Sequence, residues 1–164
     1  MPLLLIQLIK LKTEKIMSDE VGYVLSVVLV FFVWCAYSYI EGVREAYYYH
    51  SAIVSGDSSK YNVHMLYTQQ RVIVIALIFV VLGVSFTSVV ACVSFTHIFP
   101  LIHDGAYYCK RNDLNTMIYN KRWKADSSTS TAKFEIKYRG RLIMFICGMS
   151  LIITTVILTL LKII

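Results

Sequence analysis

The ionisable side chains most capable of chemistry gather between residues 41 and 71. They are two glutamates, two arginines and two histidines: Glu41, Arg44, Glu45, His50, His64 and Arg71. Two histidines and a carboxylate can hold zinc or iron, and the same groups could perform acid–base catalysis. Folding the segment about Ser58 would instead bring the glutamates near Arg71, in an ion-paired seam between two helices. No close-spaced metal motif such as H-E-x-x-H is present, which favours the seam.

A second ionisable group, basic and interleaved with an aromatic ring, begins after residue 109. Its members are Lys110, Arg111, Lys121, Arg122, Trp123 and Lys124. Such a surface can lie on anionic lipid headgroups, although the same cations can also serve only to set membrane topology. His97, His103 and Asp104 precede this group, near the expected end of a membrane span. The sequence contains no recognisable nucleic-acid-binding module, so we expect no nucleic-acid partner.

Other chemical motifs are missing from the sequence. The four cysteines form no C-x-x-C pair, and there is no G-x-S-x-G motif or phosphate-binding glycine loop. We therefore expect no catalytic residue, no resident metal ion and no cofactor.

The composition indicates which elements must position these groups. Of the 164 residues, 57% are apolar and only 16% are charged, whereas about a quarter of the residues in a soluble domain are charged. This balance excludes a disordered chain, a coiled coil and an ordinary soluble enzyme. It predicts an all-α membrane protein.

Three long uncharged runs predict three transmembrane helices, at 21–40, 72–99 and 142–161. Each run is long enough, because about 20 helical residues cross about 30 Å of hydrocarbon. The 28 residues of the second run exceed that length, so this helix must tilt. Pro100 is expected to end it. We expect the first two spans to continue outside the membrane as a helical hairpin over 41–71.

The remaining segments set the orientation. Residues 1–20 are expected to be an interfacial helix or a disordered start, and residues 100–141 form a long basic loop. Twelve of the 16 lysines and arginines lie in these two segments, which three spans would place on one side. Basic residues favour the cytoplasmic side. We therefore predict a cytoplasmic N-terminus and loop, with the hairpin and the C-terminus outside, in a cell, inner or organelle membrane.

Small residues recur at helical spacing in two of the predicted spans. They are Ala76, Gly83, Thr87 and Ala91 in the second span and Gly148, Thr155 and Thr159 in the third. Such stripes let helices approach closely in lipid, so we expect these residues to pack helix against helix.

The function expected from these features is binding, as an accessory or regulatory subunit or as a self-associating membrane component. The partners would be the lipid bilayer, anionic headgroups, and other membrane subunits or further copies of the chain. Two alternatives remain open: an oligomeric pore or membrane-perturbing effector, and a membrane enzyme with a metal or acid–base site in the 41–71 hairpin. Hydroxyl residues of the second span would line the pore: Ser85, Thr87, Ser88, Ser94 and Thr96.

Overall fold

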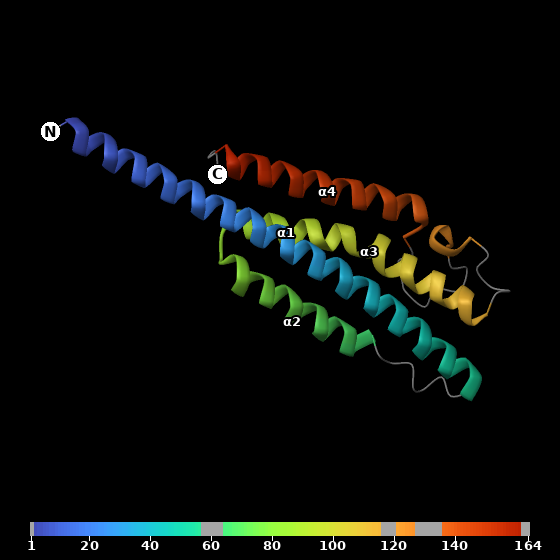
Figure 1. The fold of residues 1–164 in the computed structure, drawn as a ribbon. Coiled ribbons are helices and arrows are strands. Elements are labelled where there is room, and N and C mark those ends of the chain that lie inside the picture. The colour runs from blue at the N-terminus through green and yellow to red at the C-terminus, as the bar shows by residue number, and fades with distance from the viewer. Residues whose placement is uncertain (1, 57–63, 116–120, 127–135, 162–164) are drawn as a thin grey trace.

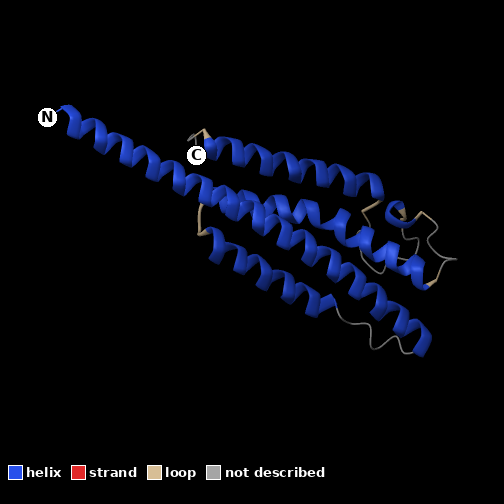
Figure 2. Cartoon of the chain, in the orientation of Figure 1, coloured by secondary structure: helices blue, strands red, loops and turns tan. Residues whose placement is uncertain are grey.

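The computed structural model is an arrangement of long α-helices (Figure 1). It describes the backbone of residues 2–56, 64–115, 121–126 and 136–161, and side chains from residue 21 onward except those of 64–66 within these ranges. The elements are α1 (Pro2–Ser55), α2 (His64–Leu82), α3 (Phe86–Leu114), the short 3₁₀ helix η2 (Arg122–Lys124) and α4 (Tyr138–Leu160). The described part of the chain contains no β-strand (Figure 2). The prediction of an all-α fold is confirmed.

Three helices are long and apolar enough to cross a membrane: α1 from Val21 onward, α3 and α4. Large apolar side chains cover their outer faces, with Phe32 63% and Ile143 62% exposed. This exposure suits hydrocarbon rather than water. The chain is therefore a multi-pass membrane protein, as its composition predicts. The fourth helix, α2, has a shorter apolar stretch, Tyr67–Leu82.

α1 and α3 lie side by side and run in the same direction (Figure 1). Near the start of α3, the hydroxyl of Tyr23 donates a 2.6 Å hydrogen bond to Thr87 Oγ1. Farther along both helices, Trp34 Nε1 donates a 2.9 Å bond to the Phe95 carbonyl. Because residue numbers rise together in the two pairs, the helices are parallel, and α2 must carry the chain back between them.

α2 and α4 run antiparallel to α1 and α3. The Arg71 side chain at the polar start of α2 bonds to Glu41 in α1, and α2 ends at Leu82, next to the start of α3. Arg141, at the start of α4, lies 3.9 Å from Asp104 in α3, and α4 ends near the first residues of α3 (Figure 1). The end of α1 and the start of α2 therefore lie at the same end of the bundle as the end of α3 and the start of α4.

The prediction of one tilted helix over 72–99 is wrong. α2 ends at Leu82, Gly83 has a φ of +73°, and Ser85 caps the start of α3 in an extended conformation. Glycine adopts this left-handed conformation without the steric cost that a Cβ would bring. The Ser85 side chain accepts from the Ser88 amide, and Ser88 Oγ accepts from the Ser85 amide. This reciprocal capping box satisfies helix-end amides inside an apolar stretch, so the run divides into two antiparallel helices.

The prediction that Pro100 ends the second span is also wrong. Pro100 lies inside α3, which continues to Leu114. Helices that cross a membrane tolerate proline, because packing against neighbours and local adjustment compensate for the lost hydrogen bond. The first part of the predicted 100–141 loop is consequently helical. Residues 116–120 and 127–135 of that loop lie outside the described part of the chain.

Residues 2–20 do not form a separate element. Their backbone is helical and continuous with the rest of α1, which projects past the other three helices at this end (Figure 1). The expected alternative of a disordered start is therefore replaced by an extension of the first span.

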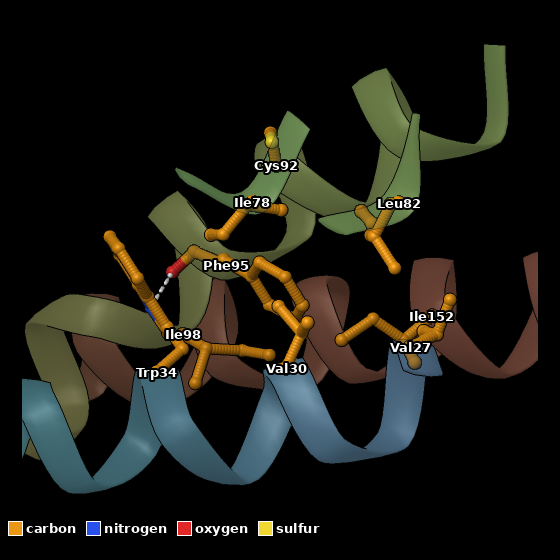
Figure 3. Close-up of a cluster of buried hydrophobic side chains, with 10 residues drawn as sticks. Val27, Val30, Trp34, Ile78, Leu82, Cys92, Phe95, Ile98 and Ile152 are labelled. Carbon is orange, nitrogen blue, oxygen red and sulfur yellow. Dashed lines mark hydrogen bonds between the residues drawn. The ribbon is translucent and has the colours of Figure 1, made fainter. Parts of the chain in front are cut away.

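The interior of the bundle is an apolar core to which all four helices contribute (Figure 3). At its centre the Trp34 indole stacks on the Phe95 ring, with centroids 6.0 Å apart. The other core side chains shown are Val27, Val30, Ile78, Leu82, Cys92, Ile98 and Ile152. The core keeps the helices together along the length that the outer apolar band covers.

Candidate functional site

Each helix changes from apolar to polar at the same end of the bundle, which we call the polar end. Glu41 follows the uncharged run of α1, Arg71 precedes that of α2, His103 follows that of α3 and Arg141 precedes that of α4. Glu41, His103 and Arg141 are 1%, 6% and 0% exposed. Charged groups this buried need partners, and we call the set formed by these partners the ionic cluster: Glu41, Glu45, Arg71, His103, Asp104 and Arg141.

Glu41 and Arg71 join α1 to α2. Arg71 donates from Nε at 2.9 Å and from a terminal nitrogen to the same Glu41 oxygen, Oε1. The guanidinium also lies 4.4 Å from the centroid of the Phe99 ring in α3. Charge-assisted hydrogen bonds of this kind are about twice as strong as neutral ones, and the ring adds a cation–π contact.

His103 lies between carboxylates from two helices. Its Nε2 is 3.0 Å from Glu45 Oε2 and 3.8 Å from Glu41 Oε1, and its Nδ1 is 2.9 Å from Asp104 Oδ1. The imidazole stacks on Phe99 with centroids 4.7 Å apart. Both ring nitrogens therefore face oxygen acceptors, an arrangement that suits the doubly protonated, charged ring.

Arg141 ties α4 and the segment around η2 to the cluster. One terminal nitrogen lies 2.5 Å from the Ala125 carbonyl and 3.3 Å from Asp126 Oδ1, and the other lies 3.9 Å from Asp104 Oδ2. The guanidinium also lies 5.2 Å from the Tyr108 ring centroid. This fully buried arginine thus contacts α3 and the chain beyond η2 at once.

Two glycines allow the close packing at this end. A Cβ on Gly42 would overlap the carbonyl oxygen of His103, so the backbones of α1 and α3 touch beside the cluster. A Cβ on Gly105 would overlap the indole of Trp123, which covers α3 on its other side. No sequence pattern singles out either glycine, because their neighbours lie far away along the chain.

The structure brings together part of the group predicted over 41–71. Glu41, Glu45 and Arg71 lie in the cluster, which supports the expected ion-paired seam. Arg44 lies beside it, bonding to Gln70 and placing its guanidinium 4.9 Å from the Tyr67 ring centroid. His50 is partly exposed, more than one helical turn beyond Glu45. The side chain of His64 lies outside the described residues.

The sequence prediction misses the cluster's partners from the second half of the chain. It places His103 and Asp104 at the end of a span, but on the opposite side of the membrane from Glu41. The 3.0 Å distance between Glu45 and His103 puts both segments at one end, so that assignment does not hold. The break at Gly83 is the cause, since it adds an antiparallel helix, α2, between α1 and α3.

The predicted packing residues divide into two sets. In α4, Gly148, Thr155 and Thr159 are all buried, and a Cβ on Gly148 would crowd the Ser94 carbonyl of α3. Ala91 is buried in α3, and Thr87 bonds to Tyr23. Ala76 and Gly83 are exposed. The stripe predicted for one continuous span therefore does not form a single face, because α2 and α3 are separate helices.

The predicted basic residues also divide. Lys110 Nζ lies 4.7 Å from the Tyr47 ring centroid, and the Arg111 guanidinium lies 3.7 Å from that of Tyr49, so both contact α1. Trp123 packs against Gly105. Lys121, Arg122 and Lys124 are exposed.

The chemistry of the ionic cluster is that of mutual neutralisation. Its three carboxylates alternate with two guanidinium groups and a histidine, and its centre is shielded from water. Among the described residues, no group of three or more His, Cys, Asp or Glu side chains is arranged to hold a metal ion. No protein-family model matches this chain, and no curated protein or solved structure matches it.

Proposed function

We propose that the protein acts by binding, as an accessory or regulatory subunit of a membrane assembly or through self-association. The observation that carries the proposal is the ionic cluster, which uses charges from all four helices to hold them together. Charges so buried stabilise a defined arrangement of helices, and they are poorly placed to meet a substrate. A rigid membrane scaffold with an exposed contact surface is the function that this arrangement favours.

The interior also favours binding over a pore. Between Tyr23 and Glu41 most of the α1 side chains that fill the core are apolar, and the buried hydroxyl of Ser38 donates to the Trp34 carbonyl of its own helix. Hydroxyls of α3 that could line a channel bond within their own helix: Ser94 donates to the Val90 carbonyl and Thr96 to that of Val93, both at 2.7 Å. Hydroxyls used in this way offer little to water or ions.

A contact surface is available where α1 extends beyond the apolar band. Tyr47 and Tyr48 are 50% and 51% exposed, and Ile53 and Val54 near the end of the helix are 57% and 73% exposed. Tyrosine is enriched at protein interfaces. Apolar side chains exposed past the membrane-facing stretch favour a protein partner.

The parallel packing of α1 and α3 supports a revised orientation. If α2 crosses the membrane as it returns the chain, the two termini lie on one side and both connecting segments on the other. Twelve of the 16 lysines and arginines then lie in the segments at the polar end, 41–71 and 100–141. The positive-inside tendency therefore favours a cytoplasmic polar end and external termini, in place of the cytoplasmic N-terminus predicted from the sequence.

Purification in mild detergent followed by mass analysis tests the proposal. We expect a complex heavier than one chain, and we expect Ile53→Ser/Val54→Ser to dissociate it while leaving the helix content unchanged. Arg122→Ser, which changes an exposed residue away from α1, is the matched control and should leave the complex intact. A lone chain in every detergent, at every protein concentration, would contradict the proposal.

A further inference from the structure

An open groove follows the outward face of α1 just beyond the uncharged run that ends at Ile40. Its volume is about 610 Å³, and its walls include Ile40, Val43, Arg44, Tyr47, Tyr48 and Ser51. These positions recur every three or four residues, so they share one face of the helix. The groove therefore begins at the edge of the apolar band and continues along the extramembrane part of α1.

The lining changes in character along the groove. Tyr39, Ile40 and Val43 line the inner end, two of them aliphatic, whereas Arg44, the hydroxyls of Tyr47 and Tyr48, and Ser51 supply polar groups farther out. From residue 40 to residue 51 a helix rises about 16 Å. A phospholipid at the membrane surface has the same order of groups, with an acyl chain inside and a phosphate headgroup outside. Tyrosine is typical of this interfacial level.

The charged side chains of the groove are positive. Arg44 lines it, and its terminal nitrogen bonds to the neutral side chain of Gln70 rather than to a carboxylate. The Arg44 Nε is buried without a hydrogen-bond partner. Lys110 does not line the groove, but its Nζ lies 4.7 Å from the centroid of the Tyr47 ring that forms one wall, which adds positive charge nearby.

The carboxylates on this stretch of α1 face elsewhere. Glu41 is bonded to Arg71, and Glu45 lies beside His103, so both are turned into the ionic cluster. Opposite charges thus lie on different faces of α1: Glu41 and Glu45 face the ionic cluster, and Arg44 faces the groove. An anion in the groove meets cations and hydroxyls without an opposing glutamate.

We propose that this groove binds an anionic phospholipid. The headgroup phosphate lies at Arg44, where the hydroxyls of Tyr48 and Ser51 can donate to its oxygens. The acyl chains run past Val43 and Ile40 onto the exposed apolar face of α1. This site goes beyond the proposed binding of a protein partner and does not depend on it.

Native mass spectrometry of the full chain in detergent, with added phosphatidylglycerol or phosphatidylcholine, tests the site. A cation at a membrane surface contributes about 1 kcal/mol to binding of anionic lipid, so we expect Arg44→Gln to weaken phosphatidylglycerol binding about fivefold. Ser51→Trp fills the groove from an exposed position and should abolish the bound lipid. Arg122→Gln removes an exposed cation outside the groove and should leave binding unchanged.

Thermal unfolding of each variant separates loss of the site from loss of the fold. Equal binding of phosphatidylcholine and phosphatidylglycerol would overturn the proposal. So would phosphatidylglycerol binding that survives Ser51→Trp in a folded protein but is lost in Arg122→Gln. Displacement by millimolar inorganic phosphate alone would also overturn it, because the acyl chains would then contribute nothing. The groove shares Tyr47 and Tyr48 with the proposed protein-contact surface, so the protein complex is tested separately by Ile53→Ser/Val54→Ser, which changes two residues outside the groove.

Discussion

Glu41 illustrates how the protein keeps charge at the edge of a membrane. Its carboxylate is fully buried, bonded to Arg71 and 3.8 Å from His103. The desolvation of such a group is costly, and removing one member of a buried pair leaves the other charge uncompensated. The Glu41–Arg71 pair therefore fixes the position of α2 against α1, and its net contribution to the free energy of unfolding is small.

Arg71→Met is expected to lower the free energy of unfolding by about 2–3 kcal/mol, at the low end for a buried pair because the Arg71 side chain is 35% exposed. The double change Glu41→Leu/Arg71→Met removes both charges and should recover most of that loss. Equilibrium unfolding in mixed detergent micelles measures both values. Arg122→Met, at an exposed position, should have no effect. If the double variant were as unstable as Arg71→Met, the loss would not come from a stranded glutamate.

The cluster could be predicted in part from the sequence. Glu41, Glu45 and Arg71 lie within about 30 residues of one another, and a hairpin is enough to bring them together. His103 and Arg141 join them only because α3 is parallel to α1, which no local pattern indicates. Residue type identified the charges that need partners, whereas the choice of partner depends on the whole fold.

The backbones of α1 and α3 approach each other closely at Gly42. A Cβ there would meet the His103 carbonyl and lie 3.1 Å from the Tyr107 amide nitrogen, both of them backbone atoms. Backbone cannot move aside as a flexible side chain can. Any larger residue must therefore push the two helices apart.

Gly42→Ala is expected to destabilise the protein by about 1–3 kcal/mol, the cost typical of overpacking. It should also weaken the hydrogen bond between Trp34 and the Phe95 carbonyl farther along the same interface. Gly22→Ala is the matched control, because Gly22 lies in the same helix and a methyl group added there would have nothing within 4 Å. Thermal unfolding, followed by the fluorescence of Trp34 and Trp123, distinguishes the two. Equal melting temperatures for both variants would contradict the close approach.

The helices themselves were predictable where the uncharged run had the length of one crossing, as at 21–40 and 142–161. The run at 72–99 misled because its turn carries no charge: Gly83 and Ser85 are compatible with an apolar span. The sequence did contain a signal for the turn: Gly83 is a residue that typically ends a helix, and Ser85 with Ser88 forms a capping box that begins the next one. Pro100 led to the opposite error, because it predicted a helix end where the helix continues. In α3, packing against neighbouring helices compensates for the hydrogen bond that proline cannot make.

For the whole molecule, the direction of the helices determines where the ends of the chain lie. α1 and α3 are parallel, and α2 and α4 return. If α2 crosses the membrane as we propose, four passes place both termini on one side, whereas three would separate them. The number of passes therefore determines whether the termini or the polar end of the bundle faces a cytoplasmic partner.

Tags at the two termini are therefore expected to be cleaved together when a membrane-impermeant protease is added to sealed vesicles of known orientation. A third tag inserted at residues 127–135 should show the opposite accessibility in the same vesicles. Detergent solubilisation should expose all three tags and is the control for protease activity. Cleavage of only one terminal tag would contradict the four-pass arrangement.

The parallel pair also dictates an order of synthesis. The indole of Trp34 reaches its acceptor on Phe95 only after 61 further residues have left the ribosome. Until then the inward stripe of α1 can meet only α2, which is made earlier and supplies Ile78 and Leu82 to the same core. The core of this protein is therefore complete only when α3 and α4 have been made, and a chain interrupted before Phe95 would lack the ring on which Trp34 stacks.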